Sequence, residues 1–199
     1  MIRNIATILP EYYTASQCKE IEDVCFTFPE KNANVIDEKD GKTLVDASDP
    51  IRKSKIRFLD MNNTEGDLLG ASQLAIELNE LAIKINKDYY DFDVKGVDAI
   101  QYTEYDSSYE GHYSWHTDWN WSLKINPIRK LSMTIQLSDS ADYEGGEFEI
   151  AHELPVDNKH STKLGTVICF PSMFHHRVLP VTAGLRKSLV VWFTGPKFI

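Results

Sequence analysis

The stretch Tyr105–Asp118, YDSSYEGHYSWHTD, ends in the triplet His116-Thr117-Asp118 and follows a run of β-forming residues. In a β-strand, residues two apart point to the same face of the sheet. An imidazole and a carboxylate with this spacing could therefore bind one ion without bending the backbone. The triplet predicts two ligands of a metal site on a β-rich scaffold.

A third ligand has to come from elsewhere, and FPSMFHHRV at 170–178 offers the adjacent histidines His175 and His176. Alternation along a strand would point only one of them inward. Two histidines and one carboxylate on one side of an ion leave its other positions open, as non-haem Fe(II) oxygenases require. Ten residues after His176, the guanidinium of Arg186 could bind a carboxylate through two hydrogen bonds.

Size and composition indicate one globular domain. The chain has 199 residues, of which 42% are hydrophobic and 26% charged. Its net charge of −9 argues against a nucleic-acid partner, because non-specific affinity for phosphates comes mainly from Lys and Arg. Three scattered cysteines favour a reducing compartment, and no segment has the length of a membrane span. We expect a cytoplasmic protein without a membrane partner.

The N-terminal part, about residues 1–95, is expected to be a mainly helical support. A helix from Thr14 or Ser16 to Phe26 has an apolar stripe that includes Cys18 and Cys25. Leucine and isoleucine recur at three and four residues from Asp67 to about Tyr89, which predicts a second helix packed on a sheet. Strands are expected at 2–9 and 54–59. The polar segment 30–49 is expected to be a surface loop, with a lid over the site as the alternative.

From residue 96 to about 196 the sequence consists of short β-type runs separated by turns. Such a pattern is typical of a barrel or a jelly roll. The predicted fold class is α+β, mainly β, with the N-terminal helices packed on one sheet. The runs are VDAIQYTEY (97–105), KLSMTIQLS (130–138), EFEIAH (147–152), GTVICF (165–170), HHRVLPV (175–181) and SLVVWFT (188–194).

Five segments together resemble the Fe(II)- and 2-oxoglutarate-dependent oxygenases, in particular the prolyl-4-hydroxylase-like branch. They are GHYSWHTD (111–118), RKLSMTIQL (129–137), YEGGEFEI (143–150), FPSMFHHRVLPVTAG (170–184) and LRKSLVVWF (185–193). The resemblance implies a double-stranded β-helix, which is a jelly roll, and extends back to about residue 50. It implies that His116, Asp118 and His176 are the iron ligands, because the family spacing selects His176 over His175.

The resemblance also implies that Arg186 binds the distal carboxylate of 2-oxoglutarate. Ser188, two residues further on the same strand face, and Tyr105 are expected to help, with Ser132 and Gln136 as further candidates. The branch often has Lys where this chain has Arg186. The alternative for Arg186 is a structural salt bridge with an acidic residue.

A dioxygenase is therefore implied, using O₂ and 2-oxoglutarate to hydroxylate a C–H bond and releasing succinate and CO₂, with ascorbate as a helper. The expected substrate is a prolyl or another protein side chain. Alternatives are a small-molecule hydroxylase, a non-catalytic jelly-roll binding module and a cupin-type metal enzyme that would need His112. The nucleic-acid-dealkylating relatives carry a second Arg where this chain has Trp192, which again argues against nucleic acid.

Aromatic residues crowd around the triplet and could form a rim for a proline ring or a sugar, or could fill the core. They are Tyr109, Tyr113, Trp115, Trp119 and Trp121. No feature of the sequence indicates an oligomeric state.

Overall fold

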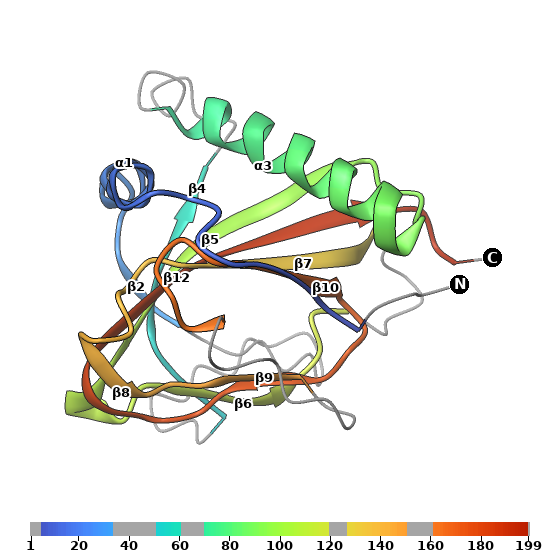
Figure 1. Ribbon diagram of the computed structural model, residues 1–199. Coiled ribbons are helices and arrows are strands. Elements are labelled where there is room, and N and C mark those ends of the chain that lie inside the picture. Colours follow the sequence, from blue (N-terminus) through green and yellow to red (C-terminus); the bar gives the residue numbers. More distant parts are fainter. Residues whose placement is uncertain (1–4, 34–50, 61–69, 120–126, 151–160, 199) are drawn as a thin grey trace.

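Two antiparallel sheets face each other in the computed structural model, which describes residues 5–33, 51–60, 70–119, 127–150 and 161–198 (Figure 1). In spatial order, the larger sheet contains β1 (Thr7–Leu9), β10 (Val167–Pro171), β7 (Ile128–Gln136), β12 (Val181–Gly195), β5 (Gly96–Asp106), β4 (Lys55–Leu59) and β2 (Lys31–Asn32), while β8 (Tyr143–Gly145) pairs with β12. The smaller sheet contains β3 (Arg52–Lys53), β6 (His112–His116), β11 (His176–Val178) and β9 (Phe148–Ile150). A short 3₁₀ helix, Ser107–Tyr109, connects β5 to β6. The predicted jelly roll is confirmed.

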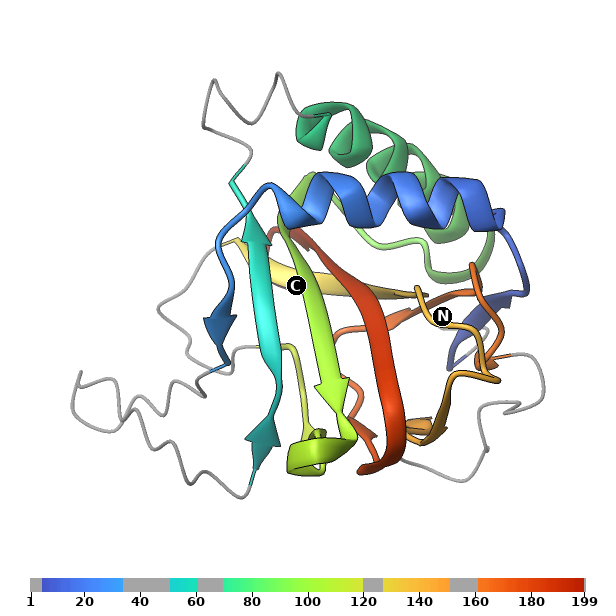
Figure 2. The same cartoon turned by 90° about the vertical axis from the view of Figure 1, so that its left-hand side faces the viewer.

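Two helices cover the outer face of the larger sheet, as predicted (Figures 1 and 2). Helix α1 (Ala15–Phe26) begins after Thr14, whose hydroxyl accepts a hydrogen bond from the Gln17 backbone N–H. Helix α3 (Ala71–Ile85) continues into a π-helical turn, Asn86–Tyr90. None of the helices in the described ranges combines the length and apolarity needed to cross a membrane.

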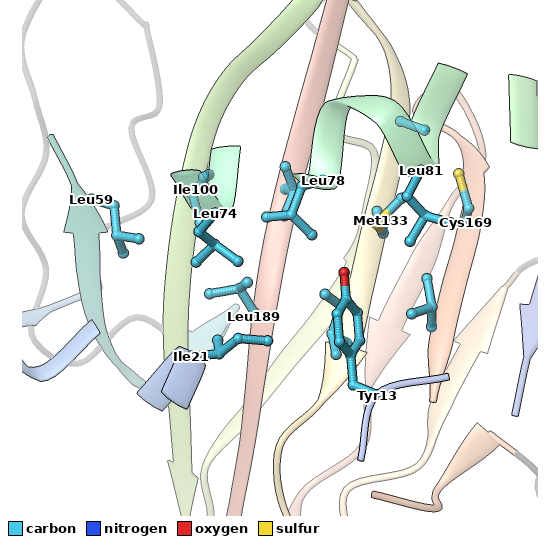
Figure 3. Packing of buried hydrophobic residues seen from close by; sticks show 14 of the residues in the cluster. Tyr13, Ile21, Leu59, Leu74, Leu78, Leu81, Ile100, Met133, Cys169 and Leu189 are labelled. Carbon is cyan, nitrogen blue, oxygen red and sulfur yellow. The ribbon is translucent and has the colours of Figure 1, made fainter. Parts of the chain in front are cut away.

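The main hydrophobic core lies between these helices and the sheet. Helix α3 directs Leu74, Leu78 and Leu81 toward the strands (Figure 3). The facing strand residues include Ile100 of β5, Leu189 of β12, Met133 of β7 and Cys169 of β10 (Figure 3). The leucine period seen in the sequence therefore corresponds to the buried face of the helix.

The opposite face of the same strands points between the two sheets and is more polar. On β7, Leu131, Met133 and Ile135 belong to the hydrophobic core on the helix side of the sheet. Ser132, between Leu131 and Met133, and Gln136, which follows Ile135, are buried on the opposite side. Strands β5 and β12 repeat this alternation, with helix-side apolar residues and inward-facing polar ones. Since burying polar side chains is unfavourable unless they find partners, this inner face marks the region where a ligand is expected.

Three expectations about individual elements were wrong. The runs HHRVLPV and SLVVWFT were expected to form separate strands, but β12 extends without a break from Val181 to Gly195 and β11 ends at Val178. Strand β6 ends at His116, so Asp118 lies beyond the strand rather than on it. The first strand was expected to include Ile5 and Ala6, but the described strand is Thr7–Leu9, and residues 2–4 lie outside the described residues.

Most of the polar segment 30–49 lies outside the described residues, and so does the start of the second predicted helix, 67–69. A division into a helical support and a jelly-roll core at residue 96 stays a prediction.

Candidate active site

The structure brings His116, Asp118 and His176 together at one end of the space between the sheets. His116 ends β6 and His176 begins β11, and the two residues are direct partners in the β6–β11 pairing. The Nε2 atom of His116 lies 3.8 Å from Oδ1 of Asp118, and Nε2 of His176 lies 3.5 Å from Oδ2. One potential ligand atom from each residue lies within 4.8 Å of the others, so the group could hold a metal ion.

Hydrogen bonds to the backbone fix how the two imidazoles are presented. Nδ1 of His116 lies 2.8 Å from the carbonyl oxygen of Ser114, and Nδ1 of His176 lies 3.0 Å from that of Phe174. A carbonyl oxygen can only accept, so each Nδ1 carries the proton and each Nε2 keeps its lone pair for a ligand. Burial and the neighbouring imidazole of His176 lower the pKa of His116 to about 3, so this ring is neutral at neutral pH.

Asp118 is held in place although it lies past the end of β6. Its backbone N–H donates to the carbonyl oxygen of Ser172, and the hydroxyl of Ser132 donates to Oδ2 at 2.7 Å. The Ser132 hydroxyl also lies 2.9 Å from that of Ser172. Burial alone would raise the pKa of Asp118, but the two imidazoles and the Ser132 hydrogen bond outweigh it and lower the pKa. The group is therefore a carboxylate at neutral pH.

A cavity of about 380 Å³ connects this cluster to Arg186. Arg186 is only 1% exposed, and its terminal nitrogens donate to Gln136 Oε1 at 3.0 Å and to Ser188 Oγ at 3.4 Å. Among the residues that the structure describes, no carboxylate lies within salt-bridge distance of it. A buried cation with only neutral partners is unfavourable unless an anion completes the site. The salt-bridge alternative for Arg186 thus finds no support in the described part of the chain.

A glycine makes room for Arg186. Gly146 has a φ of +68°, and a Cβ atom there would lie 2.8 Å from Cδ of Arg186. Any other residue would strain the turn and collide with the arginine. The Gly145-Gly146 pair before β9 therefore shapes the seat of the guanidinium as well as the turn.

The other predicted anion-site residues divide into two groups. Ser188, Gln136 and Tyr105 lie around Arg186, whose guanidinium carbon is 5.5 Å from the centre of the Tyr105 ring. Ser132 does not, because it contacts Asp118 at the opposite end of the cavity. The expectation that Ser132 lies beside the distal carboxylate of 2-oxoglutarate was therefore wrong.

Of the aromatic residues near the triplet, only Tyr113 lines the cavity among those described. Its ring stacks on that of His116 with a centroid distance of 3.4 Å. Trp115 is 43% exposed, and Trp119 packs against Phe198. Besides Tyr105, the remaining aromatic lining comes from residues that were not predicted as part of a rim, namely Phe58, Phe148, Phe170 and Trp192.

The other histidines take no part in the cluster. His175 is exposed, whereas His176 is only 5% exposed. His112 lies outside the metal-competent group, and its Nδ1 is 2.7 Å from the carbonyl oxygen of Glu110. His152 and His160 lie outside the described residues.

Two cavity arginines were missed by the sequence analysis. Arg129 pairs with Asp98 at 2.9 Å and lies over the Trp192 ring, with its guanidinium carbon 4.0 Å from the ring centre. Arg52, on β3, lies over the Tyr113 ring at 4.5 Å. Neither residue occurs at a spacing that relates it to the metal ligands, so nothing in the sequence identified them.

Comparison with known sequences agrees with this site. The profile described as the 2OG-Fe(II) oxygenase superfamily matches residues 100–194, which contain all three residues of the cluster and Arg186. A PKHD-type hydroxylase of Psychrobacter sp. (strain PRwf-1) is 45% identical over 88 residues, which are 40% of this chain and 32% of that protein. One from Janthinobacterium sp. (strain Marseille) is 27% identical over 196 residues, which are 92% of this chain and 76% of that protein. The first curated relatives are matched over about a third of their length.

Solved structures share the fold at low sequence identity. A Pseudomonas putida prolyl-4-hydroxylase has a TM-score of 0.64 and 19% identity, and the match covers 97% of this chain and 94% of that one. A Trichoplax adhaerens prolyl hydroxylase, in complex with a hypoxia inducible factor peptide fragment, has a TM-score of 0.67 and 16% identity, with coverages of 96% and 84%.

Proposed function

Because residues 100–194 match the profile of the 2OG-Fe(II) oxygenase superfamily, we propose that the chain is an iron- and 2-oxoglutarate-dependent dioxygenase. It hydroxylates a C–H bond of its substrate and releases succinate and CO₂. The observation that carries the proposal is a single cavity with a His-Asp-His cluster at one end and a buried arginine without a described carboxylate partner at the other. A metal ion and a dicarboxylic acid together would satisfy both ends.

The donor set fits Fe(II). His116 and His176 each offer an Nε2 lone pair, and Asp118 offers a carboxylate oxygen. This two-histidine, one-carboxylate set leaves positions open for other ligands. Bound iron would supply the activation of O₂ and 2-oxoglutarate that no side chain can provide.

The protein itself would orient 2-oxoglutarate and exclude water from the cavity. Arg186 would bind the distal carboxylate of 2-oxoglutarate through its planar fork, with Ser188 and Tyr105 beside it. Gln136 holds the guanidinium in place at 3.0 Å. Because the arginine is 1% exposed, the ion pair would form in a region of low dielectric and be little screened by salt.

For the substrate, we propose a prolyl or another protein side chain. The fold shared with prolyl hydroxylases, one of them solved with a peptide, supports this choice by analogy. A small-molecule hydroxylase is the second candidate, favoured by a cavity near the lower end of the range for small-molecule sites. A third candidate, which is not an enzyme, is a non-catalytic jelly-roll binding module.

The direct test is anaerobic addition of Fe(II) and 2-oxoglutarate to the purified protein. We expect the weak visible charge-transfer band of an iron–oxo-acid chelate, followed by succinate formation when O₂ and ascorbate are added. If a correctly folded protein gave neither the band nor succinate, the binding module would replace the enzyme. Succinate release stimulated by proline-containing peptides or by small metabolites would separate the two substrate classes.

Ser132→Ala should weaken metal binding roughly 10- to 100-fold, as the loss of a hydrogen bond that orients a ligand typically does. The reason is that Asp118 Oδ2 would lose the 2.7 Å hydrogen bond that holds its carboxylate. Titration with Fe(II) under argon or with Co(II) measures the effect. Ser132→Thr restores the hydroxyl and serves as the control, and equal affinity of the alanine and threonine variants would contradict the assigned role.

A further inference from the structure

The lining of the cavity is basic although the chain is acidic. The protein has 30 acidic and 21 basic side chains. The described lining of the cavity nevertheless contains Arg52, Arg129 and Arg186, while Asp118 is its sole carboxylate. A local excess of positive charge against the overall composition indicates a site for anions.

Two of the three arginines are accounted for. Arg186 would neutralise the distal carboxylate of 2-oxoglutarate, and Arg129 is paired with Asp98 at 2.9 Å. In the complex proposed above, Fe(II) and Arg186 add three positive charges, whereas Asp118 and the cosubstrate add three negative ones. Arg52 is the cavity cation that remains without compensation among the described residues.

Two side-chain contacts orient Arg52 beside the metal cluster. Its Nε donates to Ser54 Oγ at 2.8 Å, and its guanidinium carbon lies 4.5 Å from the centre of the Tyr113 ring. Tyr113 in turn stacks on the His116 ring at 3.4 Å. The terminal nitrogens of Arg52 have no acceptor in the described part of the chain. A guanidinium fixed in this way is ready for a two-point contact with a carboxylate.

We propose that Arg52 binds a carboxylate of the primary substrate, which is therefore an acid, held with its reacting carbon beside the metal cluster. This inference rests on the proposed function and deepens it. The carboxylate could belong to an amino acid's own backbone or to an acidic side chain of a peptide. The chemistry recognised by Arg52 is the same in both cases.

Binding to the Zn(II)- and 2-oxoglutarate-loaded protein tests the proposal without turnover, because Zn(II) has no redox chemistry. One arm compares N-acetyl-proline with N-acetyl-prolinamide, and the other compares N-acetyl-Asp-Pro-amide with N-acetyl-Asn-Pro-amide. Calorimetry on wild type, Arg52→Gln and Lys53→Gln gives the affinity ratio of acid to neutral compound. Lys53 is the matched control, since it carries the same charge but lies outside the cavity lining and faces Glu110 at 3.9 Å.

In at least one arm, wild type and Lys53→Gln should bind the acid at least about tenfold more tightly than its neutral partner, and Arg52→Gln should lose the preference. The ratio matters because a purely structural role of Arg52 would weaken both compounds alike. A ratio near one in both arms for wild type, no measurable binding of either acid, or a preference retained in Arg52→Gln would overturn the proposal. Titration of 2-oxoglutarate is done first, and a failure there counts against the proposed function instead.

Discussion

His176→Ala should abolish succinate formation, whereas His175→Ala should leave it within about twofold of wild type, as is usual for surface substitutions. The two residues are adjacent and chemically identical, yet only His176 is buried and lies 3.5 Å from Asp118. Removing its imidazole would leave two of the three ligands and a much weaker metal site. Both variants remove the same side chain, so comparing them shows whether succinate formation requires an imidazole at position 176 in particular.

Iron content after anaerobic reconstitution and succinate formation measure the outcome, and circular dichroism checks the fold. His176→Ala is expected to bind little iron while keeping its β-sheet signal. Turnover surviving in His176→Ala but lost in His175→Ala would mean that the other histidine is the ligand. Loss of succinate formation in both variants, with intact folding, would point to a role of the segment Phe174–His176 other than metal coordination.

The elements with a clear period could be predicted from the sequence. The leucine repeat gave helix α3 with its buried face, and the Thr14 cap placed the start of α1. The residues of β12 were predicted to belong to two separate runs, HHRVLPV and SLVVWFT. In the structure, Val181–Gly184 pairs with β8, and the same strand then pairs with β5 and β7. The continuity of β12 across its pairing with β8 and then with β5 and β7 is set by tertiary contacts, which local residue preferences do not encode.

The candidate site was predictable where it depends on local spacing and not where it depends on strand register. Gln136 pairs with Ser188, which places it at the Arg186 end of the cavity. Ser132 lies four residues earlier on the same strand, roughly 13 Å away at about 3.3 Å per residue, and so reaches Asp118 instead. Arg52 reaches the cavity because it pairs with Tyr113 across β3 and β6. No motif in the sequence carries that register.

Arg186→Met should raise the KM for 2-oxoglutarate about 30-fold or more, because losing one partner of a buried charge pair costs about 2–5 kcal/mol. Arg186→Lys should fall between this variant and wild type, since an ammonium group keeps the charge but not the planar fork. Succinate formation at varied 2-oxoglutarate concentration measures the effect. Lys187→Gln is the matched control, because Lys187 points to the other side of β12 and forms an ion pair with Glu22.

The unfolding of the same variants separates a ligand anchor from a structural ion pair. A buried arginine that belonged to a salt bridge would destabilise the protein by about 3–5 kcal/mol when replaced. Arg186 has no such partner in the described residues, so Arg186→Met, of similar volume, should leave the free energy of unfolding without 2-oxoglutarate within about 1 kcal/mol of wild type or raise it. Saturating 2-oxoglutarate should stabilise wild type through mass action but leave Arg186→Met almost unchanged. A large loss of stability in the absence of 2-oxoglutarate would show that the arginine holds the fold together and would remove the main argument for a dicarboxylic acid in this cavity.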